Sequence, residues 1–553
     1  NCLPKTAWPP TSDLNGLAIT AGSLETQAGA TVTDAGTTAI NMANSTDVAV
    51  TNGGTLNSAD LDVTKGTIQG GTVQSADAEV ESEGTLSGVV GVFEKLVNTG
   101  QVLLASGSID SLTNAGTVES DGALTVAGTN AGTLTVKDTG SYEVEAGKTF
   151  TNDKDLTVDG SATIAGTLTT SASGTTNLNG QTAVSGLIDN AGTLNLVEAE
   201  VEQGGKISNT GTLEAVSVEL ADGSTLTFAN GSAHVEKLDA QTGSVIESNG
   251  GTSTVDDLNA TNVTYNQTGG IFSAAAGWFK DSVLNIMGGT LDASGIKDDE
   301  GNVSGSLGHN TVNISGQTDM PVINDADIPD QKKDWANGMT VVKTDTLTSE
   351  TTVNIAEGGV LDVENISLDS GNKTLTLNGG AIQTGLDQIF SSVTTEGIKI
   401  DATDPETGSV DFETEVIAST DVGAVKDSIS QNVAINSGDI VFDDDFFSWS
   451  TVESAADKLA DAFDMSETFI HFIGSMAEEF TVDTAKDLVA EGSEAVLGGI
   501  VLDNTTLHNT TEVAGDTVKD LVIGGTADGA NSIDISMGFK NVANAENVTI
   551  TGG

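Results

Sequence analysis

The chain has 553 residues with 80 acidic and 20 basic side chains, which gives a formal net charge of −60. Every basic residue is a lysine, and this balance argues against binding to nucleic acid or to anionic lipid, both of which need clustered Lys and Arg. Aromatic residues make up 4% of the chain and Cys2 is the one cysteine, so an aromatic-rich globular core and an intrachain disulfide are also excluded.

Residues 1–15 are predicted to be an irregular leading segment or a tag, because Pro4, Pro9 and Pro10 surround Trp8. The chain begins at Asn1 rather than at Met, so we expect that a leader was removed or that the chain was trimmed. No apolar run reaches about 18 residues, and we expect no membrane-spanning segment.

From residue 16 to residue 439 the dominant feature is a repeated unit of Asn, a small residue, Gly, a polar residue and an aliphatic residue. Asn and Gly tolerate positive φ and turn the chain, and the stretches that follow alternate as half-buried strands do. A degenerate copy begins at Asn152, and the regular copies start 16, 16, 60 and 19 residues apart. The regular copies begin at Asn98, Asn114, Asn130, Asn190 and Asn209. A second form of the unit carries two glycines, at Gly53-Gly54, Gly70-Gly71, Gly288-Gly289, Gly358-Gly359 and Gly379-Gly380.

A turn and a short strand that recur in this way predict an all-β, single-chain β-solenoid with coils of roughly 16–22 residues. The alternative is an array of β-sandwiches, which needs aromatic core residues and tight hairpin signals that are scarce here. Two loop insertions are expected within the solenoid. One lies near 271–281, around Phe272, Trp278 and Phe279, and the other near 318–338, around Pro321 and Pro329.

Residues 440–498 are predicted to be a small helical insertion, because apolar residues recur there at helical spacing. Three runs show this spacing: Val452, Ala455, Ala456, Leu459 and Phe463; Phe469, Ile470, Phe472, Ile473 and Met476; and Ala485, Leu488 and Val489. Residues 499–553 return to the strand-and-turn pattern and end within it at Gly553, so we expect the natural protein to continue.

The Asn-Ala-Gly-Thr-Leu units and stretches such as Thr374-Leu375-Thr376-Leu377 resemble the passenger domains of type V autotransporters, nearest to the adhesin and pertactin-like branch. The resemblance covers roughly residues 16–440 and 499–553 and rests on motifs of low complexity. It implies a right-handed parallel β-helix, export across the bacterial outer membrane, and display at the cell surface. It also implies a tether through a C-terminal β-barrel, which this sequence does not contain.

The sequence offers no recognisable catalytic centre, and we expect no enzyme activity. A Ser/His/Asp triad needs a histidine, but none of the four histidines lies in a protease-like segment: His234, His309, His471 and His508. A polysaccharide lyase or hydrolase is the alternative, since such enzymes also use parallel β-helices. These enzymes need paired carboxylates, but in so acidic a chain such pairs arise by chance. The absence of Arg also disfavours a lyase that acts on acidic sugars.

No cofactor is expected, with calcium as the alternative. Acidic clusters stand at Asp298-Asp299-Glu300 and Asp443-Asp444-Asp445, but neither matches a calcium-loop spacing, and solvated acidic turns explain them equally well. Cys2 and the scattered histidines give no zinc spacing.

Ligand-binding residues are sought in the interruptions, where all four tryptophans lie. Aromatic residues on loops of a rigid scaffold are frequent binding residues, although each can also fill a local gap in the packing. The candidates are Trp335, Lys332, Lys333, Trp278 and Trp449.

The sequence thus predicts a non-enzymatic, secreted surface protein that acts in adhesion or aggregation. The expected partner is a host surface protein, a glycan or a second copy of the chain. A passive surface-layer or spacer protein is the further alternative.

Overall fold

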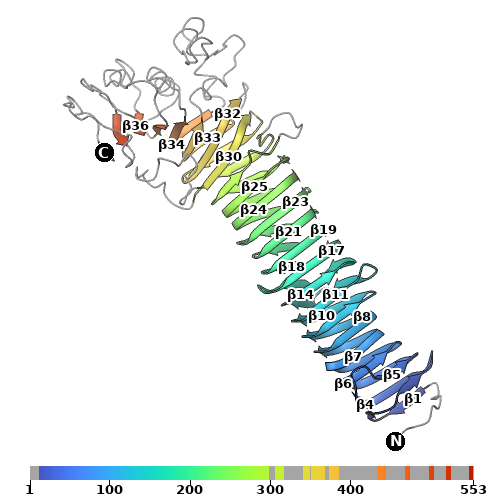
Figure 1. Cartoon of the computed structure of the whole chain (residues 1–553). Helices are drawn as coiled ribbons and strands as arrows, with labels where there is room; N and C mark the ends of the chain where they lie inside the picture. The colour runs from blue at the N-terminus through green and yellow to red at the C-terminus, as the bar shows by residue number, and fades with distance from the viewer. Residues whose placement is uncertain are drawn as a thin grey trace, which may run out of the picture. The chain divides into compact units, whose positions relative to one another are not determined.

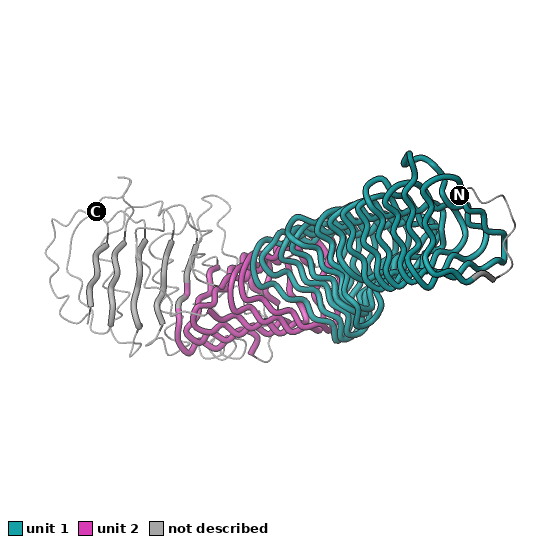
Figure 2. Tube along the Cα trace, turned by 90° about the horizontal axis from the view of Figure 1, so that it is seen from below, with its two compact units in different colours: residues 1–256 teal, residues 257–553 magenta. Residues whose placement is uncertain are grey.

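The computed structural model describes residues 11–297, 305–316, 340–348, 350–367 and 373–384, and the strands at 433–443, 468–473, 497–503, 518–524 and 547–551. The chain divides into two compact units, residues 1–256 and 257–553, coloured separately in Figure 2. The described part contains no helix, and therefore no helix that could cross a membrane. Its strands pair in parallel and stack as a β-solenoid of about 18 turns, which confirms the predicted fold class (Figure 1).

The strands of the first unit are short in most coils and run together around the corners in others. They are β1 (Thr11–Leu14), β2 (Leu17–Ile19), β3 (Leu24–Thr26), β4 (Thr31–Asn41), β5 (Val48–Asn52), β6 (Thr55–Gln69), β7 (Thr72–Asn98), β8 (Gln101–Asn114), β9 (Thr117–Ser120), β10 (Leu124–Asn130), β11 (Thr133–Val136), β12 (Ser141–Val144), β13 (Thr149–Asn152), β14 (Asp155–Val158), β15 (Ser161–Ile164), β16 (Thr167–Thr170), β17 (Thr175–Val184), β18 (Leu187–Asn190), β19 (Thr193–Val201), β20 (Lys206–Asn209), β21 (Thr212–Leu220), β22 (Thr225–Phe228) and β23 (Ser232–Ala240).

β24 (Val245–Thr261) contains the boundary between the units. The strands of the second unit that follow it are β25 (Thr264–Ala274), β26 (Gly277–Lys280), β27 (Val283–Ile286), β28 (Thr290–Asp292), β29 (Thr311–Ile314), β30 (Thr340–Thr348), β31 (Thr352–Ala356), β32 (Gly359–Ser367), β33 (Leu375–Thr384), β34 (Val433–Asp443), β35 (Thr468–Ile473), β36 (Leu497–Asp503), β37 (Val518–Gly524) and β38 (Asn547–Thr551).

A coil of the first unit consists of three strand stretches joined by corners. β11, β12 and β13 form one such coil, and β14, β15 and β16 lie on them in the same order, each in parallel register with its predecessor. Buried and partly exposed residues alternate along each strand, so every coil places one set of side chains inside and the other outside. The inside rows are mainly Val, Leu and Ile, which pack well on their own kind in the next coil.

The repeated Asn is a buried residue that ties each coil to the next. Asn114 accepts a hydrogen bond on Oδ1 from the Gly116 amide at 3.1 Å, which closes its own turn. Its Nδ2 donates to Asn130 Oδ1 at 2.6 Å and to the Thr133 carbonyl at 3.1 Å, both in the following coil. Asn98, Asn114, Asn130 and Asn152 thus form a continuous ladder of amides, and Asn190 and Asn209 form a second one.

Between the two ladders the same position is filled by hydroxyl groups. Thr170 occupies the Asn position of the intervening coil, in register with Asn152 and Asn190. Its hydroxyl lies 2.8 Å from that of Thr176, and Asn152 Nδ2 donates to Thr176 Oγ1 at 3.0 Å. The 60-residue gap in the sequence repeat is therefore occupied by coils that keep this position in register, although one register shift occurs between Leu178 and Gln181 of β17.

The repeated unit needs Gly because the backbone of the preceding coil comes too close for a Cβ, not because φ is positive. This corrects the sequence-based prediction that the glycine serves to permit positive φ. A Cβ at Gly116 would lie 2.3 Å from the Gly100 carbonyl oxygen in the coil before it. Neither Asn114 nor Gly116 has a positive φ. Positive φ does explain the two-glycine form at Gly70 and Gly71, whose φ values are 75° and 64°.

Two of the expected irregular segments contain regular strands, so the prediction is wrong for 271–281 and for Thr11–Leu14, while residues 1–10 lie outside the described residues. Within residues 1–15, Thr11–Leu14 form β1 and pair in parallel with Thr31–Asp34. The segment 271–281 is not a loop insertion, since β25 and β26 run through it. Phe272 and Phe279 are fully buried there, with ring centroids 5.2 and 5.6 Å from that of Tyr265. Aromatic residues are few but fill the interior of these coils, where a projecting loop was expected.

The predicted helical insertion at 440–498 is wrong wherever the structure describes it. β34 runs to Asp443, β36 begins at Leu497, and residues 468–473 form β35, parallel to both. The second of the three predicted helical runs overlaps this strand. The remaining parts of 440–498, and the loop expected at 318–338, lie outside the described residues.

Asp34 is a buried carboxylate that fastens an early corner of the first unit. Its Oδ1 accepts hydrogen bonds from the amides of Gly16 at 2.7 Å and Gly36 at 2.9 Å, and its Oδ2 accepts one from Thr38 Oγ1 at 2.9 Å. Burial alone would raise the pKa of Asp34, but these hydrogen bonds outweigh it and hold the pKa below the ordinary value of 3.8.

Removing one rung of the buried ladder should loosen the coils beside it. In Asn114→Ala, the Asn98 side-chain amide and the Thr133 carbonyl lose their bonds to Asn114, while the Gly116 amide keeps its bond to the Asn98 carbonyl. A buried polar group left unsatisfied costs about 1–3 kcal/mol. We expect faster amide hydrogen exchange over residues 114–134 in this variant. Thr113→Ala, at the exposed neighbouring position, is the control and should leave exchange unchanged. Equal exchange in both variants would show that the amide contributes nothing.

The Asp34 carboxylate should make stability depend on pH in acid. Because its folded pKa is lowered, its contribution is complete above the unfolded pKa near 3.8 and disappears as the pH falls through the folded pKa. Wild type should therefore exceed Asp34→Asn in free energy of unfolding at about pH 5, and the difference should shrink toward about pH 2. A difference that stays constant over this range, measured by denaturant unfolding, would contradict this role.

Candidate functional site

Four successive strands of the second unit present an uncharged outer surface. The first four residues of β25, β27, β29 and β31 pair in register, so each position forms a row across the coils. Their buried rows face the core, and their partly exposed rows face outward. The outward side chains, which we name the asparagine face, are Thr264, Asn266, Val283, Asn285, Thr311, Asn313, Thr352 and Asn354.

The second outward row is a ladder of four amides. Asn285 Nδ2 donates to Asn266 Oδ1 at 3.0 Å, Asn313 Nδ2 donates to Asn285 Oδ1 at 2.9 Å, and Asn354 Nδ2 donates to Asn313 Oδ1 at 2.9 Å. All bonds run in the same direction, so every amide has the same orientation. The row ends at Thr376 of β33, which is in register with Asn354.

The corner that precedes this face has an unusual backbone. Positive φ angles occur at Asn262 (54°), Asp281 (50°) and His309 (59°), and among the described residues these are the non-glycine positions that have them. Each stands two residues before its strand, at the same corner of three successive coils. Asn, Asp and His tolerate this conformation better than other residues, so the corner turns sharply and starts each strand at the same place.

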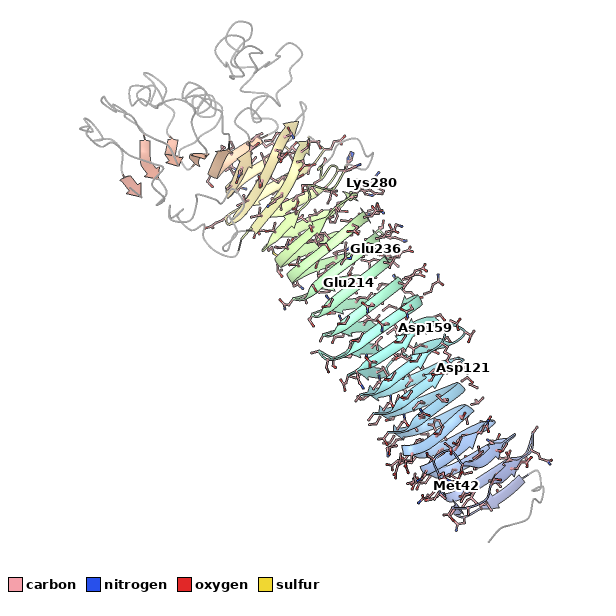
Figure 3. The ribbon with its side chains drawn as sticks, viewed as in Figure 1. Met42, Asp121, Asp159, Glu214, Glu236 and Lys280 are labelled. Atoms are coloured by element: carbon pink, nitrogen blue, oxygen red, sulfur yellow. The ribbon has the colours of Figure 1, made fainter. Side chains whose placement is uncertain are left out.

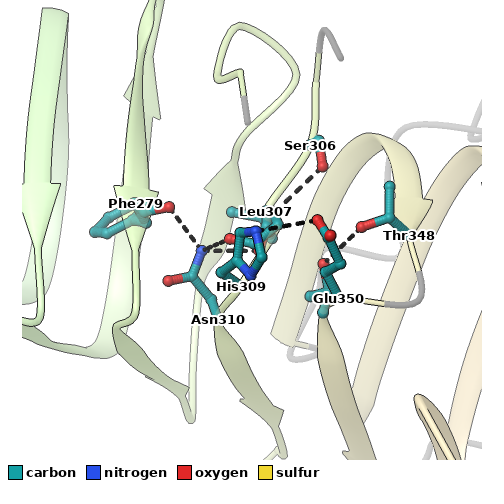
Figure 4. A network of polar contacts seen from close by, with 9 residues as sticks. Phe279, Ser306, Leu307, His309, Asn310, Thr348 and Glu350 are labelled. Carbon is teal, nitrogen blue, oxygen red and sulfur yellow. Dashed lines mark hydrogen bonds and ion pairs between the residues drawn. The ribbon is translucent and has the colours of Figure 1, made fainter. Parts of the chain in front are cut away.

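Buried polar groups hold this corner together (Figure 4). Asn310 Nδ2 donates to the carbonyls of Phe279, Leu307 and Gly308, each at 2.8 Å, and Asn310 Oδ1 accepts from the Ser282 amide at 2.8 Å. Ser282 Oγ in turn accepts from the Val263 amide at 3.1 Å. At the surface of the same corner, His309 Nε2 lies 3.1 Å from Glu350 Oε2.

Long insertions do not disturb the face. Successive asparagines of the ladder are 19, 28 and 41 residues apart in the sequence, yet they remain stacked. Much of the extra sequence, at 298–304 and 317–339, lies outside the described residues. The rows are therefore set by cross-coil pairing and by the corner network rather than by coil length.

Other outer rows are charged, in the second unit at Asp292, Lys343 and Asp362 and more often in the first unit. Glu200, Glu219 and Asp239 follow one another in register on its outer surface. Other carboxylates, such as Asp121, Asp159 and Glu236, are also exposed, and Figure 3 labels them. A shorter outward amide pair is found there as well, since Asn195 Nδ2 donates to Asn177 Oδ1 at 2.6 Å, but its row continues to Glu214 and His234.

His234 bridges two carboxylates and does not form a catalytic arrangement. Its Nε2 lies 3.1 Å from Asp256 Oδ2 and its Nδ1 lies 3.2 Å from Glu214 Oε2. The hydrogen bonds to Asp256 and Glu214 raise the pKa of His234 above its usual 6.5. Because the two carboxylates occupy opposite sides of the imidazole, the group is a cross-coil ion bridge rather than a metal chelate.

Of the binding residues predicted from the sequence, Trp278 is the one that the structure describes. It points outward from β26, is partly exposed, and stands in register with Asn259. The alternative for Trp278 is that it fills a gap in the packing, but the buried side chains that fill the interior here are Phe272 and Phe279. Trp335, Lys332, Lys333 and Trp449 lie outside the described residues, so the predicted set is not brought together.

The acidic clusters considered for calcium lie outside the described residues, apart from Asp443 in β34. In the described ranges no three His, Cys, Asp or Glu side chains come together to hold a metal ion.

The asparagine face was missed in the sequence although a signal exists. A Thr or Val, an apolar residue and an Asn recur at 264–266, 283–285, 311–313 and 352–354. The unequal spacing hides this pattern from a search for fixed repeats.

No protein-family model, no curated protein and no solved structure matches this chain.

Proposed function

We propose that this protein is a non-enzymatic surface scaffold that acts in adhesion, as an exported passenger of the autotransporter type. The observation that carries the proposal is the register of the outward rows. Equivalent side chains recur once per coil, at a repeat of about 4.8 Å. Such a surface offers many equal contacts rather than one pocket, and repeated weak contacts add up to strong attachment.

Two further features support this function. The cross-coil hydrogen bonds and the buried rows give a rigid support, which keeps the outer side chains ordered before a partner arrives. The units Asn114–Val118 and Asn190–Leu194 also resemble those of exported passenger domains, which supports display at a bacterial surface.

The net charge sets the conditions under which adhesion should be seen. A charge of −60 repels other anionic surfaces, and salt screens this repulsion within about 10 Å at 0.1 M. We therefore expect attachment and aggregation to increase with ionic strength.

Adhesion can be measured with beads coated with the whole chain. We expect them to attach to cells and to one another more than beads coated with an unrelated acidic protein, and more strongly as salt or calcium is added. If both kinds of bead settle and attach alike under every ionic condition, the chain is a passive spacer and adhesion is wrong.

A further inference from the structure

We propose that the asparagine face binds a neutral polysaccharide whose chain lies across the coils, along the amide ladder. This inference rests on the proposed adhesive function and names its partner. The face lies in the second unit and has its own corner network. Substitutions on the face can therefore test its role separately from that of the rest of the chain.

The charge of the face selects the class of partner. Its outward residues are Thr, Val and Asn, and none of them ionises, although the chain carries 80 acidic side chains. A cationic partner would bind the acidic surfaces of the chain more strongly than it would bind this face. An anionic partner meets no Lys on it. A neutral partner can approach here without desolvating a charge.

The hydrogen-bonding capacity of the ladder fits hydroxyl groups. Each amide has two N–H donors and an oxygen with two lone pairs, and an inner rung such as Asn285 uses one N–H and one lone pair along the row. One donor and one acceptor of each inner rung are thus left for a ligand. A sugar hydroxyl both donates and accepts, so it can satisfy both groups at once.

A protein partner fits the face less well. Protein interfaces centre on Trp, Tyr, Arg and other large side chains in desolvated pockets, whereas this face is built of Thr, Val and Asn. A second copy of the chain would also bring a second charge of −60 against the first.

The spacing of the rows suits a ligand that repeats. The amides of four coils recur at about 4.8 Å, each in the same orientation. A polymer of identical units can repeat the same contact from coil to coil, so modest contacts combine. The corner network around Asn310 and Ser282 holds these coils in place before binding, which reduces the entropy lost on association.

The test uses the whole chain and immobilised polysaccharides. The neutral probes are dextran, mannan and xylan, and carboxymethyl dextran is the anionic counterpart of the first. We expect binding to at least one neutral probe, insensitive to salt because no charge takes part, and weaker binding to the carboxymethylated form.

The variant Asn285→Thr with Asn313→Thr removes the middle of the ladder and should weaken this binding by about tenfold or more. Asn177→Thr with Asn195→Thr is the matched control, since it removes the equivalent outward bond from the first unit. The control removes one amide–amide bond where the ladder variant removes three, so it should lose less thermal stability and keep binding within about twofold.

The proposal is overturned if no neutral probe binds, if carboxymethyl dextran binds as well as dextran, or if both variants bind alike. Should coated beads still attach to cells while the chain binds no neutral probe, adhesion stands and the glycan assignment is wrong. If the beads do not attach either, the proposed function itself fails.

Discussion

The hydrogen bonds that side-chain amides make from coil to coil are the constraint on which the rest of this structure depends. The alternation of inner and outer side chains excludes a slip of a strand by one residue, but a slip by two residues would keep that alternation. The buried asparagines prevent such a slip. Asn114 closes its own turn through Gly116 and bonds to the next coil through Asn130 and Thr133. Any other register leaves these buried groups without partners.

The same chemistry occurs outside the core, where we propose that it serves binding. Asn266, Asn285, Asn313 and Asn354 repeat the amide-to-amide bond on the outer surface. A buried amide row specifies the fold because all its groups are satisfied within the chain. An outward row keeps part of its capacity for a ligand. The net charge of −60 repels other anionic surfaces, and for this reason we propose the uncharged face as the place where a neutral partner binds.

The sequence allowed the solenoid to be predicted because the Asn and Gly turns and the alternation of Val, Leu and Thr are local signals. It did not reveal why Gly116 is needed, since the Gly100 carbonyl that excludes a Cβ belongs to another coil. The run around Phe469 and Phe472 has helical spacing, but pairing with the strands before and after it makes β35. The asparagine face was hidden because coils of 28 and 41 residues were not expected to stay in register.

The account is tested most directly by cross-linking across the longest interruptions of the repeat, in a chain carrying Cys2→Ser. Cysteines placed at Asn285 and Asn313 stand in register on neighbouring strands, about 4.8 Å apart, which is within the reach of a disulfide. Mild oxidation should join them rapidly and quantitatively, and Asn313 with Asn354 should behave alike. Cysteines at Asn285 and Asn354, two coils apart, should not join. Failure of the neighbouring pairs, or equal cross-linking of the distant pair, would contradict the register on which both the fold and the binding face rest.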